Sequence, residues 1–257
     1  MFRKIRIAIL LLILLSVALT AWRASVRAHE WGIGQTIGLY PVNADGSAAT
    51  AAYLKTLDED SFRPIQKYMT EEMRRHGIDM PYALSLQLGP EIGKLPPPIP
   101  EQASWWQVVR WSLELRWWAW RNTPKTVLVP KVRLYLLYHG AGQTALDSAG
   151  LAKGRIGLVN LFADKRMDGS NLVVATHEML HTFGATDKYD PASLQPLDPQ
   201  GLAEPERVPR YPQQWAEIMA GRIALGSDSA EIPLALDQTL IGPDTAHEIG
   251  WDKQGAE

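Results

Sequence analysis

The stretch His177-Glu178-Met179-Leu180-His181-Thr182-Phe183-Gly184-Ala185-Thr186-Asp187 has the pattern H-E-x-x-H-x-x-G-x-x-D, and it determines which fold the chain is expected to adopt. Residues four apart lie on the same face of an α-helix, so His177 and His181 can present two imidazoles to one metal ion. Glu178 follows the first histidine directly, where its carboxylate can take a proton from a metal-bound water. The pattern therefore predicts a metal-binding helix that also carries a base.

The end of the motif predicts a third ligand. Gly184 is the residue type that most readily ends a helix in the left-handed conformation, because a Cβ atom would clash there. A sharp turn at that point lets the chain fold back and offer Asp187 as an oxygen ligand. Three protein ligands plus water is the arrangement of a catalytic zinc site, whereas a structural site is closed by four protein ligands. We therefore expect Zn²⁺ to be bound by His177, His181 and Asp187.

The residues before and within the motif favour a buried helix. Ser170-Asn171 supplies residue types that cap helix N-termini. An apolar surface follows, made of Leu172, Val173, Val174, Ala175, Met179, Leu180 and Phe183. The alternative is a core helix whose histidines are only hydrogen-bonded. That alternative explains the pattern poorly, because a buried helix must provide partners for two imidazoles and a carboxylate.

Five positions of this motif resemble the zinc-binding consensus of the metzincins in its Asp-terminated version, as in the snapalysin family: His177, Glu178, His181, Gly184 and Asp187. Tyr189 resembles the tyrosine of the D-x-Y that follows in that family. The segment 216–221 resembles the methionine-containing turn beneath the metal in metzincins, with Met219 as its methionine. The resemblance covers residues 177–221.

The resemblance implies an α+β, zincin-like fold: a twisted mixed sheet with a long backing helix and an active-site helix, and a small loop-rich C-terminal subdomain. It also implies that the strand before the helix, at 157–162, borders the cleft and pairs with an extended peptide. The implied activity is that of a zinc metalloendopeptidase with Glu178 as general base on a zinc-bound water and a peptide or protein as substrate. Tyr189 is then a candidate donor to the oxyanion.

Other residues compete for these roles. Glu217 lies downstream on a possible helix, and such a glutamate is the third ligand in thermolysin-like zincins. We favour Asp187, which needs only the helix-ending turn to reach the metal. Asp190 is a fallback ligand or a partner for an imidazole N–H. Tyr211 and Arg222 are rival donors to the oxyanion.

Two other classes of function are open to the same residues. The first is a non-catalytic zinc-binding module of the cell envelope, although a purely structural site gains nothing from a base at Glu178. The second is the hydrolysis of a non-peptide amide. Cleavage of peptides, with a chelator as control, separates the first class from a peptidase.

The N-terminus suggests a membrane anchor. A basic head at residues 2–6 precedes an apolar, uncharged run from Ile7 to Trp22, which is the pattern of a signal peptide or signal anchor. We expect residues 1–28 to form an uncleaved transmembrane anchor and residues 29–257 to form a metallopeptidase domain outside the cytoplasm. The alternative is secretion after cleavage behind Ala28.

Composition excludes several classes of partner and ligand. All 28 acidic residues follow residue 28, so the expected domain is net acidic and is a poor nucleic-acid binder. The chain has no cysteine, which excludes disulfides and thiolate ligands.

Periodicity predicts the remaining elements. Strands are expected at 31–42, 81–88, 109–117, 127–129, 132–138 and 154–162, and helices at 47–76 and 243–251. Residues 191–212 are expected to be loop, and 211–221 a short helix or turn. The strand at 109–117 belongs to a tryptophan cluster spanning 105–120. This cluster is expected to lie in the sheet core with a few rings on its rim, or alternatively at a membrane interface beside arginines.

Overall fold

A computed structural model describes the protein at residues 31, 34–81, 83–100, 104–124, 130–140, 149–151 and 155–251. Its centre is a five-stranded sheet with the order β2-β1-β3-β5-β4. Four strands are parallel, and β4 runs antiparallel to β5 at one edge. The strands are β1 (Gln35–Asn43), β2 (Leu84–Leu88), β3 (Val132–His139), β4 (Ala149–Leu151) and β5 (Ile156–Phe162). Four predicted strands are thereby confirmed, and the one at 127–129 lies outside the described residues.

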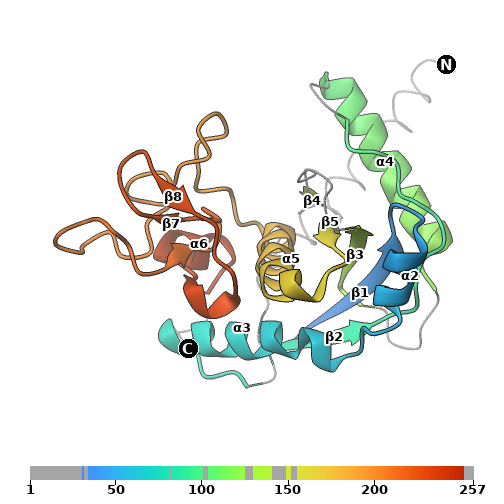
Figure 1. The fold of residues 1–257 in the computed structure, drawn as a ribbon, viewed down its shortest axis with the longest axis horizontal. Helices are drawn as coiled ribbons and strands as arrows, with labels where there is room; N and C mark the ends of the chain where they lie inside the picture. The colour runs from blue at the N-terminus through green and yellow to red at the C-terminus, as the bar shows by residue number, and fades with distance from the viewer. Residues whose placement is uncertain are drawn as a thin grey trace, which may run out of the picture.

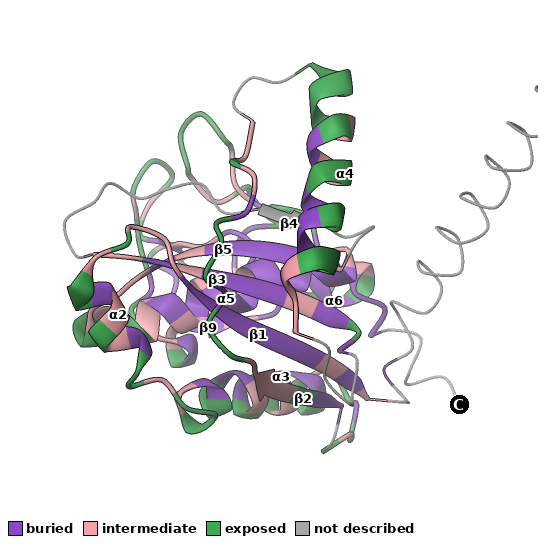
Figure 2. Cartoon of the chain, turned by 90° about the vertical axis from the view of Figure 1, so that its right-hand side faces the viewer, coloured by how far each residue is buried: buried purple, intermediate pink, exposed green. Residues whose placement is uncertain are grey.

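Helices cover both faces of this sheet (Figure 1). One face carries α2 (Ala48–Leu54), α3 (Arg63–Arg75) and α5 (Asp168–Phe183), and the other carries α4 (Trp105–Asn122). Strand alternation separates the two cores, because on β3 Leu134 and Leu136 face the three helices while Tyr135 faces α4. Figure 2 shows the buried strands with α4 standing against one side of the sheet.

The helix predicted over residues 47–76 is interrupted. It consists of α2, a 3₁₀ turn at Asp60–Phe62, and α3. Before the turn, the Ser61 N–H donates to Asp58 Oδ1 at 2.9 Å, and the Asp58 N–H donates to Ser61 Oγ at 3.1 Å. Such bonds give the backbone an alternative to helical pairing. Pro64 then stands in the first turn of α3, where no N–H donor is needed.

The strand predicted over residues 109–117 is wrong, because these residues lie in the middle of the 18-residue helix α4. At its N-terminus, the Ser104 N–H donates to Gln107 Oε1 at 2.7 Å. The buried side chains of α4 are at positions 111, 115, 118 and 119, the spacing of one helical face. The two-residue alternation arises because Leu113 and Trp117 are apolar but exposed on the opposite face.

The six tryptophans of α4 divide between its two faces. Trp111 and Trp118 pack against the sheet, and the Trp118 ring lies edge-on to Tyr135 with 4.7 Å between centroids. The other four are more than half exposed: Trp105, Trp106, Trp117 and Trp120. The expectation of a sheet core with only a few rings on its rim is therefore wrong, because the cluster lies on a helix and four of its six rings are exposed.

Residues 185–251 form a loop-rich C-terminal region, as the sequence predicts. Its short strands pair as β6 (Ala216–Glu217) with β9 (Thr239–Leu240), and as β7 (Ile223–Ala224) with β8 (Ala230–Glu231). The predicted closing helix is confirmed as α6 (Pro243–Glu248). The segment predicted as a short helix or turn at 211–221 is β6 followed by a turn.

The mixed sheet with helices on both faces is compatible with the predicted α+β class. The expectation that an extended peptide pairs along the strand at 157–162 is wrong for the first half of that strand. β5 is not the edge strand, because β4 pairs with its first half at Ile156–Leu158. An extended peptide therefore cannot pair with Ile156–Leu158 on that side, whereas no described strand lies there beside the second half of β5.

The prediction of a membrane anchor is corrected. No helix in the described part of the chain is long and apolar enough to cross a membrane. The predicted anchor at residues 1–28 lies outside the described residues.

The two faces of α4 provide a direct test of its packing. Replacing the fully buried Leu115 by alanine should lower the free energy of unfolding by about 2–5 kcal/mol, because it removes core contacts and leaves a cavity. Leu113→Ala, a matched change at a residue that is 63% exposed, should cost less than about 0.5 kcal/mol. Urea unfolding followed by circular dichroism measures both values. Equal losses would contradict the helical packing.

Candidate metal centre

The first turn of α5 is attached to the end of β5 by one side chain. Asn171 accepts from the Phe162 N–H through Oδ1 at 3.0 Å and donates from Nδ2 to the Phe162 carbonyl at 2.8 Å. These two bonds take the place of strand pairing on the side of Phe162 away from β3, where no described strand pairs with it. It fixes where the helix begins relative to the sheet, and so where the histidines two turns later are placed.

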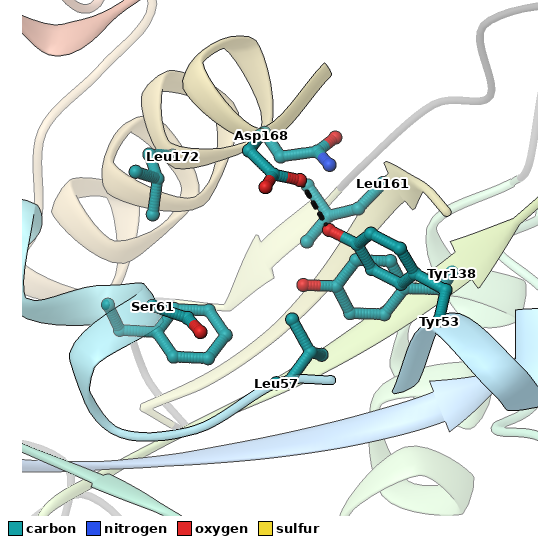
Figure 3. Close-up of a pocket in the computed structure, with 9 residues that line it drawn as sticks. Tyr53, Leu57, Ser61, Tyr138, Leu161, Asp168 and Leu172 are labelled. Carbon is teal, nitrogen blue, oxygen red and sulfur yellow. Dashed lines mark hydrogen bonds between the residues drawn. The ribbon is translucent and has the colours of Figure 1, made fainter. Parts of the chain in front are cut away.

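A second attachment lies beside a small cavity of about 90 Å³ (Figure 3). The Tyr53 hydroxyl of α2 donates to Asp168 Oδ1 at 2.6 Å. Asp168 is the first residue of α5, where a negative charge is stabilised by the helix dipole. Burial, and then the bond to Asp168, raise the pKa of Tyr53, so its hydroxyl remains a donor. The cavity contains neither motif histidine, and its residues serve to position α5.

The helix ends as the motif predicts. Gly184 has φ 109°, in the left-handed region, and its N–H donates to the His181 carbonyl at 3.1 Å. The Ala185 N–H then donates to the Leu180 carbonyl at 3.2 Å, which completes a left-handed helix ending. This reversal returns the chain toward the face of α5 that carries the histidines, and Asp187 follows within three residues.

Three donor atoms converge at this point. His177 Nε2 and His181 Nε2 are 3.1 Å apart, and Asp187 Oδ1 lies 3.2 Å from each of them. The structure thus brings together all three residues that the sequence predicts as ligands. Within the described ranges, the histidines and Glu178 form the one cluster of His, Asp and Glu side chains close enough to hold an ion.

Backbone carbonyls decide which imidazole nitrogens face the centre. His177 Nδ1 lies 2.9 Å from the Ile218 carbonyl, and His181 Nδ1 lies 2.8 Å from the Ala185 carbonyl. A carbonyl oxygen can only accept, so each Nδ1 carries the proton. Each neutral ring therefore presents the lone pair of Nε2 to the other ring and to Asp187. Such partners on the far nitrogen are typical of metal-binding histidines.

The electrostatics of the cluster favour a cation. Burial opposes the ionisation of Asp187, but its bonds to the two histidines outweigh burial, and the pKa of this carboxyl lies well below its usual range. Burial alone would lower the pKa of His177, but Asp187, Glu178 and the Ile218 carbonyl together raise it. The two Nε2 atoms and Asp187 Oδ1 are close enough that a proton or a metal cation between them stabilises the arrangement.

The donor set fits a zinc ion. In a tetrahedral site with bonds of about 2.0–2.1 Å, neighbouring ligand atoms are about 3.3 Å apart. The three separations here, 3.1, 3.2 and 3.2 Å, are close to that value without any rearrangement. Two imidazoles and one carboxylate are also a usual set of protein ligands at a zinc site with an open position.

Glu178 lies beside the cluster but is not one of the three converging ligands. Its side chain is buried, and Oε2 has no hydrogen-bond partner among the described residues. A ligand atom of Glu178 lies within 4.8 Å of those of both histidines. Burial raises the pKa of this carboxyl. An unpartnered buried oxygen is costly, so its retention here indicates a partner that the described residues do not supply.

A cleft of about 320 Å³ opens onto His177 and Glu178. Its walls are mostly apolar and come from α5, from the loop after Asp187 and from the turn after β6; they include Val173, Val174, Leu194, Ile218, Ile232 and Pro233. Three further residues with polar side chains line it, Ser170, Tyr189 and Arg222. The predicted oxyanion donor Tyr189 therefore faces the same cleft as the predicted base.

Glu217 has a structural role and is not available as the third ligand. Its Oε2 accepts from the N–H groups of Met219 and Ala220 at 2.6 and 3.1 Å. Its Oε1 accepts from the Gly242 N–H at 3.0 Å and from the Thr245 hydroxyl at 2.7 Å. These four bonds fix the turn that contains the fully buried Met219. The same turn supplies the carbonyl that orients His177.

Two other rival residues lie in structural roles. Asp190 Oδ1 accepts from the N–H groups of Ala192 and Ser193 at 3.0 and 2.7 Å, so it closes a turn. Tyr211 donates to Asp198 Oδ2 at 3.3 Å, outside the residues that line the cleft.

Sequence reasoning missed the ion pair that holds the Asp187 loop. Lys188, which is 5% exposed, donates from Nζ to both oxygens of Glu248 on α6 at 2.7 Å. Its backbone N–H donates to the Met219 carbonyl at 2.9 Å, which joins the loop to the methionine turn. No local signal could reveal this pair, because its members lie 60 residues apart.

No family model and no curated protein matches this sequence. The case for a function therefore depends on the residues and their geometry.

Two substitutions separate the roles of the rival acids. Asp187→Ala should lower zinc affinity by at least about 100-fold, because it removes one of three donors. Glu217→Gln should keep one zinc per chain but lower the free energy of unfolding by about 1–3 kcal/mol, because an amide cannot accept all four bonds. Metal analysis against a zinc buffer and urea unfolding measure the two effects. Loss of zinc in Glu217→Gln with full retention in Asp187→Ala would reverse the assignment.

Proposed function

We propose that this protein is a zinc-dependent peptidase of metzincin-like type. The observation that carries the proposal is the placement of a buried glutamate, whose Oε2 has no partner among the described residues, beside three converging donor atoms and at the wall of an open cleft. Metal ligation alone does not require Glu178 or the cleft. A hydrolytic site requires both, since a base and room for the substrate must adjoin the ligands.

His177, His181 and Asp187 would hold the metal with one position open toward the cleft. When bound, zinc lowers the pKa of water toward about 7 and polarises a carbonyl group. Glu178 takes the proton from the attacking water, whose oxygen forms the new bond to the scissile carbonyl carbon. The same carboxyl then returns the proton to the leaving amine as the carbon–nitrogen bond breaks. The raised pKa of Glu178 suits a group that must both accept and release a proton.

The cleft supports a peptide as substrate. Its apolar walls suit a hydrophobic side chain next to the scissile bond, and they exclude water from the reacting groups. Tyr189, on the same wall, is the proposed donor to the developing oxyanion. A phenolic hydroxyl gives a neutral hydrogen bond to that oxygen without competing for the metal.

The individual elements of the fold support a zincin-like assignment. A mixed sheet carries α5 on one face, α3 packs behind it, and a loop-rich region follows the motif helix. The turn around Met219 lies against the motif helix through the bond from His177 to Ile218.

The purely structural alternative fits the site less well. In a structural zinc site the Glu178 Oε2 atom would stay buried without a partner among the described residues, which lowers the free energy of unfolding and contributes nothing to metal binding. An apolar residue at that position would serve such a site better.

The test of the mechanism is Glu178→Gln in the full chain. The amide has nearly the same shape but cannot accept a proton, so kcat should fall by at least about 100-fold while zinc content is unchanged. The assay is cleavage of a mixed peptide library followed by mass spectrometry, with a chelator as control. Unchanged kcat in this variant, with zinc bound, would exclude Glu178 as the base.

A further inference from the structure

Arg222 is a cation on the wall of the candidate active-site cleft. It lines the cleft together with Glu178 and Tyr189, three residues after Met219. Among the described residues its guanidinium makes no hydrogen bond, ion pair or ring contact. A guanidinium carries five N–H donors in a planar fork, and none of these donors is used by another described residue, so they can bind a ligand.

The other arginines of the C-terminal region are used differently. Arg207 pairs with Glu204 at 3.0 Å, and Arg210 pairs with Asp198 at 2.8 Å. Both pairs hold loops together away from the cleft. Arg222 thus differs from its neighbours in position and in having no acidic partner in the described chain.

The backbone at Arg222 is held by β-pairing, and this fixes the point on the cleft wall from which its side chain extends. An isolated bridge pairs Arg222 with Glu217, and β7 begins at the next residue. The Glu217 carboxylate forms no ion pair with the guanidinium; its two oxygens accept from Met219, Ala220, Gly242 and Thr245. Glu178, across the cleft, forms no ion pair with it.

The surroundings strengthen the attraction of Arg222 for an anion. The apolar cleft walls exclude water, which lowers the screening of a charge that enters. A carboxylate matches the guanidinium fork with two parallel hydrogen bonds. The cleft therefore offers an apolar wall and a cation to the same ligand.

We propose that Arg222 forms a carboxylate-binding subsite, so that the preferred substrates are peptides with an apolar side chain and a carboxylate close to the scissile bond. This inference rests on the proposed peptidase function. The carboxylate has two possible sources, the C-terminal α-carboxylate of the peptide or an aspartate or glutamate side chain. Recognition of the C-terminal α-carboxylate would make the enzyme a carboxypeptidase-like one that shortens chain ends. Recognition of an Asp or Glu side chain would make it an endopeptidase.

The experiment compares four versions of one peptide that contains a phenylalanine, using the full-length zinc protein. The versions combine an internal glutamate or glutamine with a free or amidated C-terminus. We expect kcat/KM to be at least about 10-fold higher for a version with one carboxylate than for the version with none. The version that carries the gain identifies the source.

Variants assign the preference to Arg222. Arg222→Gln should bring the ratio of kcat/KM for charged and neutral peptides close to one, and Arg222→Lys should retain part of it because the charge remains. Arg116→Gln, a matched change on α4, should keep the wild-type ratio. The inference is overturned if the wild type shows no preference, or if Arg222→Gln keeps the preference in full.

A binding measurement keeps this test separate from the peptidase assignment. N-acetylphenylalanine and its amide are titrated into the wild type and into Arg222→Gln by calorimetry. Tighter binding of the acid than of the amide, by about 10-fold and only in the wild type, supports the subsite even if no peptide is cut. Equal binding of the acid and the amide by the wild type counts against the subsite, whatever the cleavage assay shows.

Discussion

The reversal of the chain at Gly184 is the constraint on which the metal centre depends. A helix alone can bring His177 and His181 together, but it offers no third donor beyond its last turn. The positive φ of Gly184 ends α5 within one turn of His181, and the carbonyl of the next residue accepts the His181 Nδ1 proton. The same turn then directs Asp187 toward both imidazoles. One backbone conformation therefore orients one ligand and supplies another.

Buried charges hold the loops of the C-terminal region, where strands and helices are short. The Glu217 carboxylate collects four donors, and the Lys188 ammonium is buried against Glu248. Each charge would be very costly to leave unpaired, so the loops that supply its partners are held in one arrangement. The carbonyl that orients His177 belongs to the same turn as Glu217. A loop-rich segment is thus ordered enough to fix a ligand.

Sequence reasoning succeeded where the determining interactions are local. The motif helix, its left-handed ending and the placement of Asp187 follow from residues within eleven positions of one another, and all three appear in the structure. It failed for α4, because Leu113 and Trp117 are apolar yet exposed, and exposure depends on what the rest of the chain covers. It favoured Asp187 over Glu217 as the ligand but could not reveal the role of Glu217, because two of the four donors to this carboxylate, Gly242 and Thr245, lie 25 and 28 residues away. The edge position of β4 had no signal either, because a three-residue strand carries too little periodicity.

The exposed tryptophans of α4 also affect the intrinsic fluorescence spectrum of this protein. Four of its ten indoles already lie largely in water in the folded state, on one helix. Their emission will resemble that of an unfolded chain and will change little on denaturation, whereas Trp31 and Trp251, buried beside Phe183 and each other, will report the loss of the core. Intrinsic fluorescence will therefore show a folded protein with a red-shifted component. Quenching by a water-soluble agent such as iodide should separate the two populations without any label.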